Sequence, residues 1–196
     1  MFNNEKIDLR VKYTREWTFE AISKLLEHKK YDQINISEII NKAGISRATF
    51  YRNFSTKDDV IKFKVEDFFH QFFMDMKVYY EVNKPSNERD LIGAFFEKVD
   101  ESNKLIDVVI VAKLEYLMVN GILQLITYFK DHFYQIEANN EKQEEYTMEI
   151  VASSAWTLLS RWHRSGKKES AKSLAQIYME AFKLIASALY QERNVK

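Results

Sequence analysis

The residues most suited to binding chemistry lie together in one segment of this 196-residue chain, Ile36 to Lys57, with the sequence ISEIINKAGISRATFYRNFSTK. Its second half carries hydrogen-bonding side chains on one face: Arg47, Thr49, Tyr51, Arg52 and Asn53. An arginine can bind guanine through two hydrogen bonds, and an asparagine can pair with adenine in the same way. Residues 1–64 also carry thirteen Lys and Arg against nine Asp and Glu, whereas the whole chain has no net charge. This modest local excess suits an anionic partner such as nucleic acid.

The pattern around these side chains predicts two short helices joined by a tight turn. Ser37 is expected to open the first helix, because a serine hydroxyl accepts a hydrogen bond from a free amide of the first turn. Gly44 suits the left-handed conformation just past a helix end, and Ser46 is expected to cap a second helix over 47–54. Apolar side chains occupy the interior positions: Ile39, Ile40, Ala43, Ile45, Phe50 and Phe54. Such a pair is a helix-turn-helix, whose second helix can enter the DNA major groove. The alternative is an ordinary helical hairpin with a polar face toward solvent.

Composition favours a helical chain without enzyme chemistry. Four glycines and one proline are too few for the many turns of an all-β protein, and no Gly-rich phosphate-binding loop can be written. The chain has no cysteine, which excludes disulfides, thiol nucleophiles and thiolate metal sites. We find no nucleophile–base pair, carboxylate pair or metal-ligand spacing, so we expect no enzyme, metal or cofactor. Polar residues interrupt the most apolar stretch, which argues against a membrane span.

The run KAGISRATFYRNFSTKDDV resembles the DNA-binding signature of the TetR family of bacterial transcriptional regulators. The matching residues are Ala43, Gly44, Ile45, Ser46, Thr49, Phe50, Tyr51, Phe54 and Lys57. Asn53 departs from the pattern, because the family more often has His or Tyr there. The run WTLLSRWHRSGKKESAKSLAQIYMEAF near the C-terminus also resembles a recurrent ending of the family.

The resemblance implies a role for each matching position. Tyr51, Lys57 and Ser37 would contact backbone phosphates, and Thr49 would contact a phosphate or a thymine methyl. Arg47, Ala48 and Arg52 occupy the variable positions and are the candidates for base reading. The full expected DNA-binding set is Ser37, Ser46, Arg47, Ala48, Thr49, Tyr51, Arg52, Asn53 and Lys57.

The resemblance also implies an all-α fold of about nine helices in two domains. Residues 1–55 would form the helix-turn-helix domain, joined through a long fourth helix to a helical effector-binding and dimerisation domain, 56–196. The last two helices would form a homodimer interface that includes Leu158, Leu159, Trp162, Leu174, Tyr178, Phe182 and Ile185. A small-molecule pocket would be lined by Phe72, Phe73, Phe95, Tyr116, Tyr128 and Trp156. The alternative for both sets is plain core within the protomer, and aromatic residues at helical spacing are more often core than pocket.

We therefore expect a cytoplasmic, ligand-responsive homodimeric repressor that binds a palindromic operator in double-stranded DNA. The alternative is an activator or a helical adaptor controlled by a protein co-regulator. Loss of the phosphate-facing Tyr51 and Lys57 would have favoured an adaptor, and both residues are present.

Overall fold

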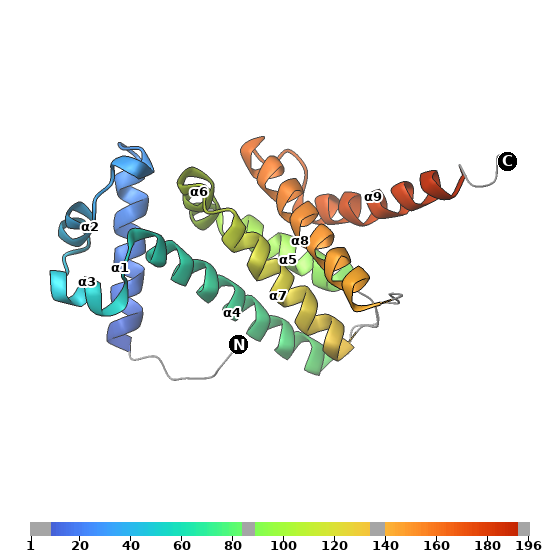
Figure 1. Ribbon diagram of the computed structural model, residues 1–196, viewed down its shortest axis with the longest axis horizontal. Coiled ribbons are helices and arrows are strands. Elements are labelled where there is room, and N and C mark those ends of the chain that lie inside the picture. Colours follow the sequence, from blue (N-terminus) through green and yellow to red (C-terminus); the bar gives the residue numbers. More distant parts are fainter. Residues whose placement is uncertain (1–8, 84–88, 134–139, 192–196) are drawn as a thin grey trace.

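The computed structural model describes residues 9–83, 89–133 and 140–191, and every regular element in these ranges is a helix (Figure 1). The elements are α1 (Leu9–Leu26), the short 3-10 helix η1 (Tyr31–Gln33), α2 (Ile36–Ala43), α3 (Arg47–Asn53), α4 (Lys57–Asn83), α5 (Arg89–Glu101), α6 (Asn103–Ala112), α7 (Tyr116–Phe133), α8 (Glu141–Arg164) and α9 (Ala171–Gln191). The expected all-α fold is confirmed. Within the described ranges, we find no helix with the length and apolar character needed to cross a membrane.

The N-terminal helices share a small core that α1 and the start of α4 help to close. Helices α2 and α3 have eight and seven residues, which is too short for stable isolated helices. Both pack against α1, and their core side chains are almost completely buried. This core includes Phe19, Ile22, Ile39, Phe50 and Ile61. Burial of these side chains therefore holds α2 and α3 in place.

Helix α4 leads from this core to the remaining helices (Figure 1). It packs against α7, which in turn packs against α8, while α5 packs against α9. The contact between α4 and α7 is close at Gly121, where an added Cβ would come within 2.1 Å of the Phe69 ring. Helix α9 extends away from the body at the end opposite α3 (Figure 1). The fold thus separates the helix-turn-helix from the last helix by the length of the molecule.

The structure corrects the expected start of α2, and it confirms the expected start of α3 and the left-handed turn at Gly44. Helix α2 begins at Ile36, and Asn35 caps it: the Asn35 side chain accepts from the Glu38 amide, and the Glu38 carboxylate accepts from the Asn35 amide. Ser37 therefore lies inside the first turn and does not open the helix. Ser46 caps α3 as expected, with its hydroxyl 3.0 Å from the Thr49 amide. Gly44 adopts the expected left-handed conformation, with φ of +68°.

Candidate nucleic-acid interface

The turn between α2 and α3 sets the direction of α3. The Gly44 amide donates to carbonyls of the last turn of α2, and the Ile45 amide donates to the Ile40 carbonyl at 3.2 Å. Phe50 is fully buried and lies 5.4 Å, centroid to centroid, from the Phe54 ring. Because these rings fix one face of α3 to the core, the opposite face is held toward solvent. The sequence pattern predicted this arrangement.

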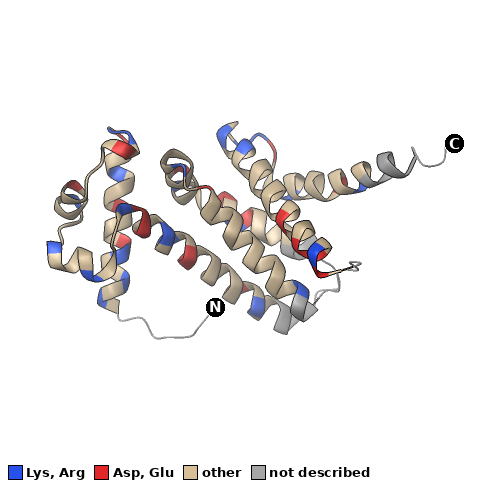
Figure 2. Ribbon diagram, viewed as in Figure 1, with Lys and Arg blue, Asp and Glu red and all other residues tan. Residues whose placement is uncertain are grey.

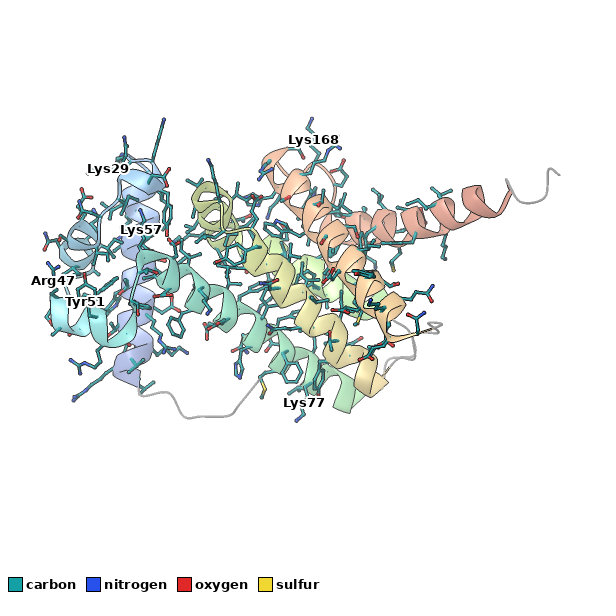
Figure 3. All side chains as sticks on the ribbon, in the orientation of Figure 1. Lys29, Arg47, Tyr51, Lys57, Lys77 and Lys168 are labelled. Carbon is teal, nitrogen blue, oxygen red and sulfur yellow. The ribbon has the colours of Figure 1, made fainter. Side chains whose placement is uncertain are left out.

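The outward face of α3 carries cationic and hydrogen-bonding groups. Arg47, Ala48, Tyr51 and Arg52 are exposed, and α3 contains no acidic residue (Figure 2). The Arg47 guanidinium lies 5.5 Å from the centre of the Tyr51 ring, and Figure 3 shows both residues at the outer end of the molecule. A cation over an aromatic ring is held loosely at an exposed site. These groups are thus available to a ligand that approaches α3.

Three polar residues of this region already have partners within the helix. The Ser46 and Thr49 hydroxyls lie 2.8 Å apart, in addition to the Ser46 cap. The Asn53 amide nitrogen donates to the Thr49 carbonyl at 2.9 Å. Asn53 would have to break this bond to pair with adenine through both atoms of its amide. Asn53, which departs from the family pattern, therefore forms a hydrogen bond within α3.

Lys57 is more engaged within the protein than the sequence suggested. Its ammonium donates to the Tyr31 carbonyl at 2.7 Å and to the Ile34 carbonyl at 2.9 Å, and it lies 4.3 Å from the centre of the Tyr31 ring. The Tyr31 hydroxyl donates to Asp58 at 2.5 Å. Burial, then the Asp58 hydrogen bond and nearby carboxylates, raise the pKa of Tyr31 far above its ordinary value. Lys57 therefore ties the turn before α2 to the start of α4, inward of Arg47 and Tyr51 (Figure 3).

Ser37 and Lys57 both line a groove between the N-termini of α2 and α4. Residues from Ile34 to Ser37 and from Ser55 to Asp58 line this groove, which has a volume of about 450 Å³. The Thr56 hydroxyl accepts from the Asp59 amide, and Asp59 accepts from the amides of Ser55 and Thr56. Helix starts carry partial positive charge, which favours anions. The carboxylates of Glu38 and Asp59 already accept from amides at these helix starts, and Asp58 lies at the rim, so Lys57 supplies the cationic group of the groove wall.

The comparisons with known proteins bear on this geometry. Residues 19–62, which run from the C-terminal part of α1 into the start of α4, match the family described as bacterial regulatory proteins, tetR family. The match covers 44 of the 196 residues, in the segment that contains the helix-turn-helix. The match supports a DNA-binding, regulatory role for the segment that contains α2 and α3. No curated protein matches the sequence.

Solved structures share the fold over nearly the whole chain. The Lin0861 protein of Listeria innocua has a TM-score of 0.79 at 16% identity, covering 93% of this chain and 96% of its own. A TetR-family transcriptional regulator from Syntrophomonas wolfei has a TM-score of 0.66 at 19% identity, covering 90% and 96%. A TetR transcriptional regulator from Streptococcus agalactiae has a TM-score of 0.61 at 16% identity, covering 89% and 96%. At these identities the likeness concerns the fold.

The structure places two of the six expected pocket residues on a cavity and four elsewhere. Phe72 and Phe95 line a cavity of about 270 Å³. Phe73 and Tyr128 pack against each other outside it, with ring centroids 4.5 Å apart, and Trp156 is buried in the core. Tyr116 is 57% exposed at the start of α7. Helical spacing identifies inward positions, but it does not distinguish a filled core from a cavity. For the same reason it missed the lining residues Phe96, Phe129, Lys130 and Met148.

Burial also divides the seven expected dimer residues. Leu159, Trp162, Leu174 and Tyr178 are buried within the protomer and have almost no surface to offer a partner, so the expectation is corrected for these four. The Trp162 ring nitrogen donates to the Glu169 carbonyl at 2.9 Å. Leu158 is half-buried, whereas Phe182 and Ile185 are exposed. The structure adds further exposed apolar side chains on α8 and α9: Tyr146, Ile150, Ile177 and Leu184.

Proposed function

We propose that the chain is a homodimeric, ligand-responsive repressor of the TetR family that binds a palindromic operator. The observation that carries the proposal is the outward face of α3, which is cationic, exposed and fixed by the buried Phe50. A recognition helix contacts base edges in the major groove chiefly through its N-terminal residues. We assign residues 1–55 to DNA binding and residues 56–196 to ligand binding and dimerisation.

The proposed base contacts come from Arg47, Ala48 and Arg52, because all three lie exposed on α3. Tyr51 is 47% exposed, and its hydroxyl would bind a phosphate beside them. Phosphate contacts position the protein, and base contacts specify the sequence. Removal of a bidentate arginine contact costs about 1–3 kcal/mol at one base pair. Ser46 and Thr49 would support the start of α3 near the same groove wall.

The second phosphate site is the groove between α2 and α4. An ammonium has three donor hydrogens, and the carbonyls of Tyr31 and Ile34 take two from Lys57. The third can serve a phosphate that also accepts from the Ser37 hydroxyl. In this proposal Lys57 has two roles: it positions the helix-turn-helix and it contacts DNA.

The proposed dimer uses the exposed apolar side chains of α8 and α9. Ile150 on α8 and Ile177, Phe182, Leu184 and Ile185 on α9 are all more than one-third exposed. Side chains of this kind on two helices can form a four-helix bundle with the same helices of a second copy. A two-fold dimer presents two α3 helices, which suits half-sites about 34–36 Å apart on DNA.

Selection of bound duplexes from a random pool tests the proposal. We expect the full chain to enrich an inverted repeat whose half-sites are about one helical turn apart. Tyr51→Phe is expected to weaken binding to every selected sequence. Tyr116→Phe is the matched control, because Tyr116 is similarly exposed but lies on α7. Failure to enrich any duplex at low ionic strength would contradict the proposal, and enrichment of a single unrepeated site would contradict its dimeric part.

A further inference from the structure

The N-terminal helices contact the rest of the protein through α1 as well as through α4. Helix α6 packs against both α1 and η1. Glu16 and Glu20 lie one turn apart on α1, so they project from the same side of the helix. The Glu16 carboxylate lies 2.6 Å from the Lys64 ammonium of α4, and the Lys104 ammonium of α6 donates to the two Glu20 carboxylate oxygens at 2.8 and 2.9 Å. Helix α1 is therefore tied to two helices of residues 56–196.

The two ion pairs constrain different movements. Helix α4 begins in the N-terminal core and continues without a break to Asn83, so the pair of Glu16 with Lys64 lies within the first turns that follow this core. Helix α6 is joined to the core along the chain only through α4 and α5. A bend of α4 beyond Lys64 would keep Glu16 and Lys64 together but would separate Glu20 from Lys104. The pair of Glu20 with Lys104 therefore resists such a pivot of the N-terminal helices.

The position of Lys104 within α6 is unfavourable for α6 itself. Lys104 lies in the first turn, where the partial positive charge of a helix start favours a carboxylate over an ammonium, and this turn has no acidic residue. The Lys104 side chain is 55% exposed, so burial does not fix it either. Its bidentate contact with Glu20 is the interaction that explains a cation at this position.

We infer that Lys104 is a positioning residue that, through Glu20, fixes the orientation of the helix-turn-helix and thereby selects the spacing between the operator half-sites. Helix α3 lies across α1 from α6, at the outer end of the molecule, so a pivot at α6 is carried to the DNA-facing side (Figure 1). One added base pair moves two half-sites apart by about 3.4 Å and turns them by about 35°. A helix-turn-helix of fixed orientation cannot follow both changes. The inference about spacing rests on the proposed dimeric function, whereas the inference about orientation does not.

Operators with identical half-sites and with spacers one base pair shorter or longer than the best one test the inference. An exposed ion pair changes an equilibrium by at most about fivefold, and a dimer contains two such pairs. We therefore expect the preference for the best spacer to fall about threefold to tenfold in Lys104→Met, measured by fluorescence anisotropy. Its preference among half-site sequences should stay that of the parent. The double variant Glu20→Lys with Lys104→Glu exchanges the two charges and should restore the spacer preference.

The matched control is Lys24→Met, which also removes one positive charge. Lys24 is exposed on the next turn of α1 after Glu20. This variant should keep the spacer preference of the parent. Because the pair of Glu20 with Lys104 is exposed, added salt should weaken the preference of the parent but change that of Lys104→Met much less. A Lys104→Met protein with the parent's spacer preference, or a charge-exchanged protein as tolerant as Lys104→Met, overturns the inference.

A distance measurement without DNA separates this inference from the proposed function. The chain has no cysteine, so spin labels can be attached at Asn41→Cys on α2 and Asn120→Cys on α7, which are both exposed positions. Pulsed electron paramagnetic resonance of labelled protein, diluted with unlabelled protein, reports the distance within one protomer. We expect a broader distribution in Lys104→Met and the parent's distribution in the charge-exchanged protein.

The two experiments together assign each failure. An unchanged distance distribution in Lys104→Met overturns the orientation role, even where the dimer and its inverted repeat are found. A broader distribution in a protein that selects no inverted repeat supports the orientation role, contradicts the proposed dimeric function and overturns the selection of spacing.

Discussion

Replacement of Lys57 by methionine separates the two roles that we assign to this residue. The variant keeps most of the apolar stem but removes the ammonium that donates to the carbonyls of Tyr31 and Ile34. A hydrogen bond from a charged group contributes about 1.5–3 kcal/mol, and a buried carbonyl that loses its donor costs a similar amount. Because Lys57 is half-buried, water can replace part of this loss. We expect the free energy of unfolding to fall by about 2–4 kcal/mol.

The same variant changes the salt dependence of DNA binding if Lys57 contacts a phosphate. The logarithm of the binding constant falls with the logarithm of salt concentration, with a slope of about −0.9 for each neutralised phosphate. A dimer loses two such contacts, so the slope should become shallower by about 1.8. Urea unfolding measures the first effect, and anisotropy titrations at several salt concentrations measure the second.

Lys62→Met is the control for both measurements. Lys62 lies on the next turn of α4, is mostly exposed, and reaches Glu66 only at 4.0 Å. The free energy of unfolding of Lys62→Met should fall by less than about 1 kcal/mol, because exposed ion pairs contribute little. A Lys57→Met protein that unfolds like the parent would refute the structural role. A destabilised variant with the parent's salt slope would leave the structural role and refute the phosphate contact.

Three further predictions follow from individual contacts. Gly121→Ala should lower the free energy of unfolding, measured in urea, by about 1–3 kcal/mol, because its Cβ would overlap the Phe69 ring of α4. Gly93 has open space around it, so Gly93→Ala should instead raise the free energy of unfolding by up to about 1 kcal/mol. Equal effects of the two substitutions would contradict the packing argument. Burial raises the pKa of Asp59, but the amides of Thr56 and Ser55 and the Thr56 hydroxyl outweigh it and hold the pKa below its usual range. Asp59→Asn should therefore cost about 1 kcal/mol at pH 7, with the difference from the parent shrinking as the pH falls below about 4, and a constant difference would refute this. If the proposed dimer forms, Leu184→Glu should shift its sedimentation toward that of the monomer at micromolar concentration, whereas Lys183→Glu on the same exposed turn should not.

The sequence predicted the helix-turn-helix well because its determinants are local. Gly44, Ser46 and Phe50 each act within a few residues, through a left-handed turn, a cap and a buried anchor. The predicted start of α2 was wrong because Asn35 and Ser37, two residues apart, are both suited to cap a helix. The pairing of Asn35 with Glu38 three residues later, which resembles a capping box, was the signal that would have decided it.

Contacts between distant elements were not predictable in this way. Nothing in the sequence places the Lys57 ammonium on the Tyr31 carbonyl, because that contact depends on how α4 leaves the N-terminal core. Four of the seven expected dimer residues are buried in the protomer for a related reason: α8 and α9 each carry one apolar stripe that packs within the protomer and another that stays exposed. Leu159 belongs to the first stripe and Ile150 to the second. The periodicity of a helix shows that one of its faces is apolar. Only the packed structure shows whether the same protomer or another molecule covers that face.

The placement of α4 gives the proposed ligand response a physical route. Phe72 lines the cavity, and the same continuous helix begins at Lys57 beside the helix-turn-helix. Its early turns are tied to α1 by Lys64, whose ammonium lies 2.6 Å from Glu16. At Gly121 the Phe69 ring of α4 packs directly on the backbone of α7, so little compressible space remains between the two helices. A ligand that widens the cavity would therefore displace α4 as a unit, and α1, α2 and α3 would move with it, changing the distance between the two α3 helices of a dimer.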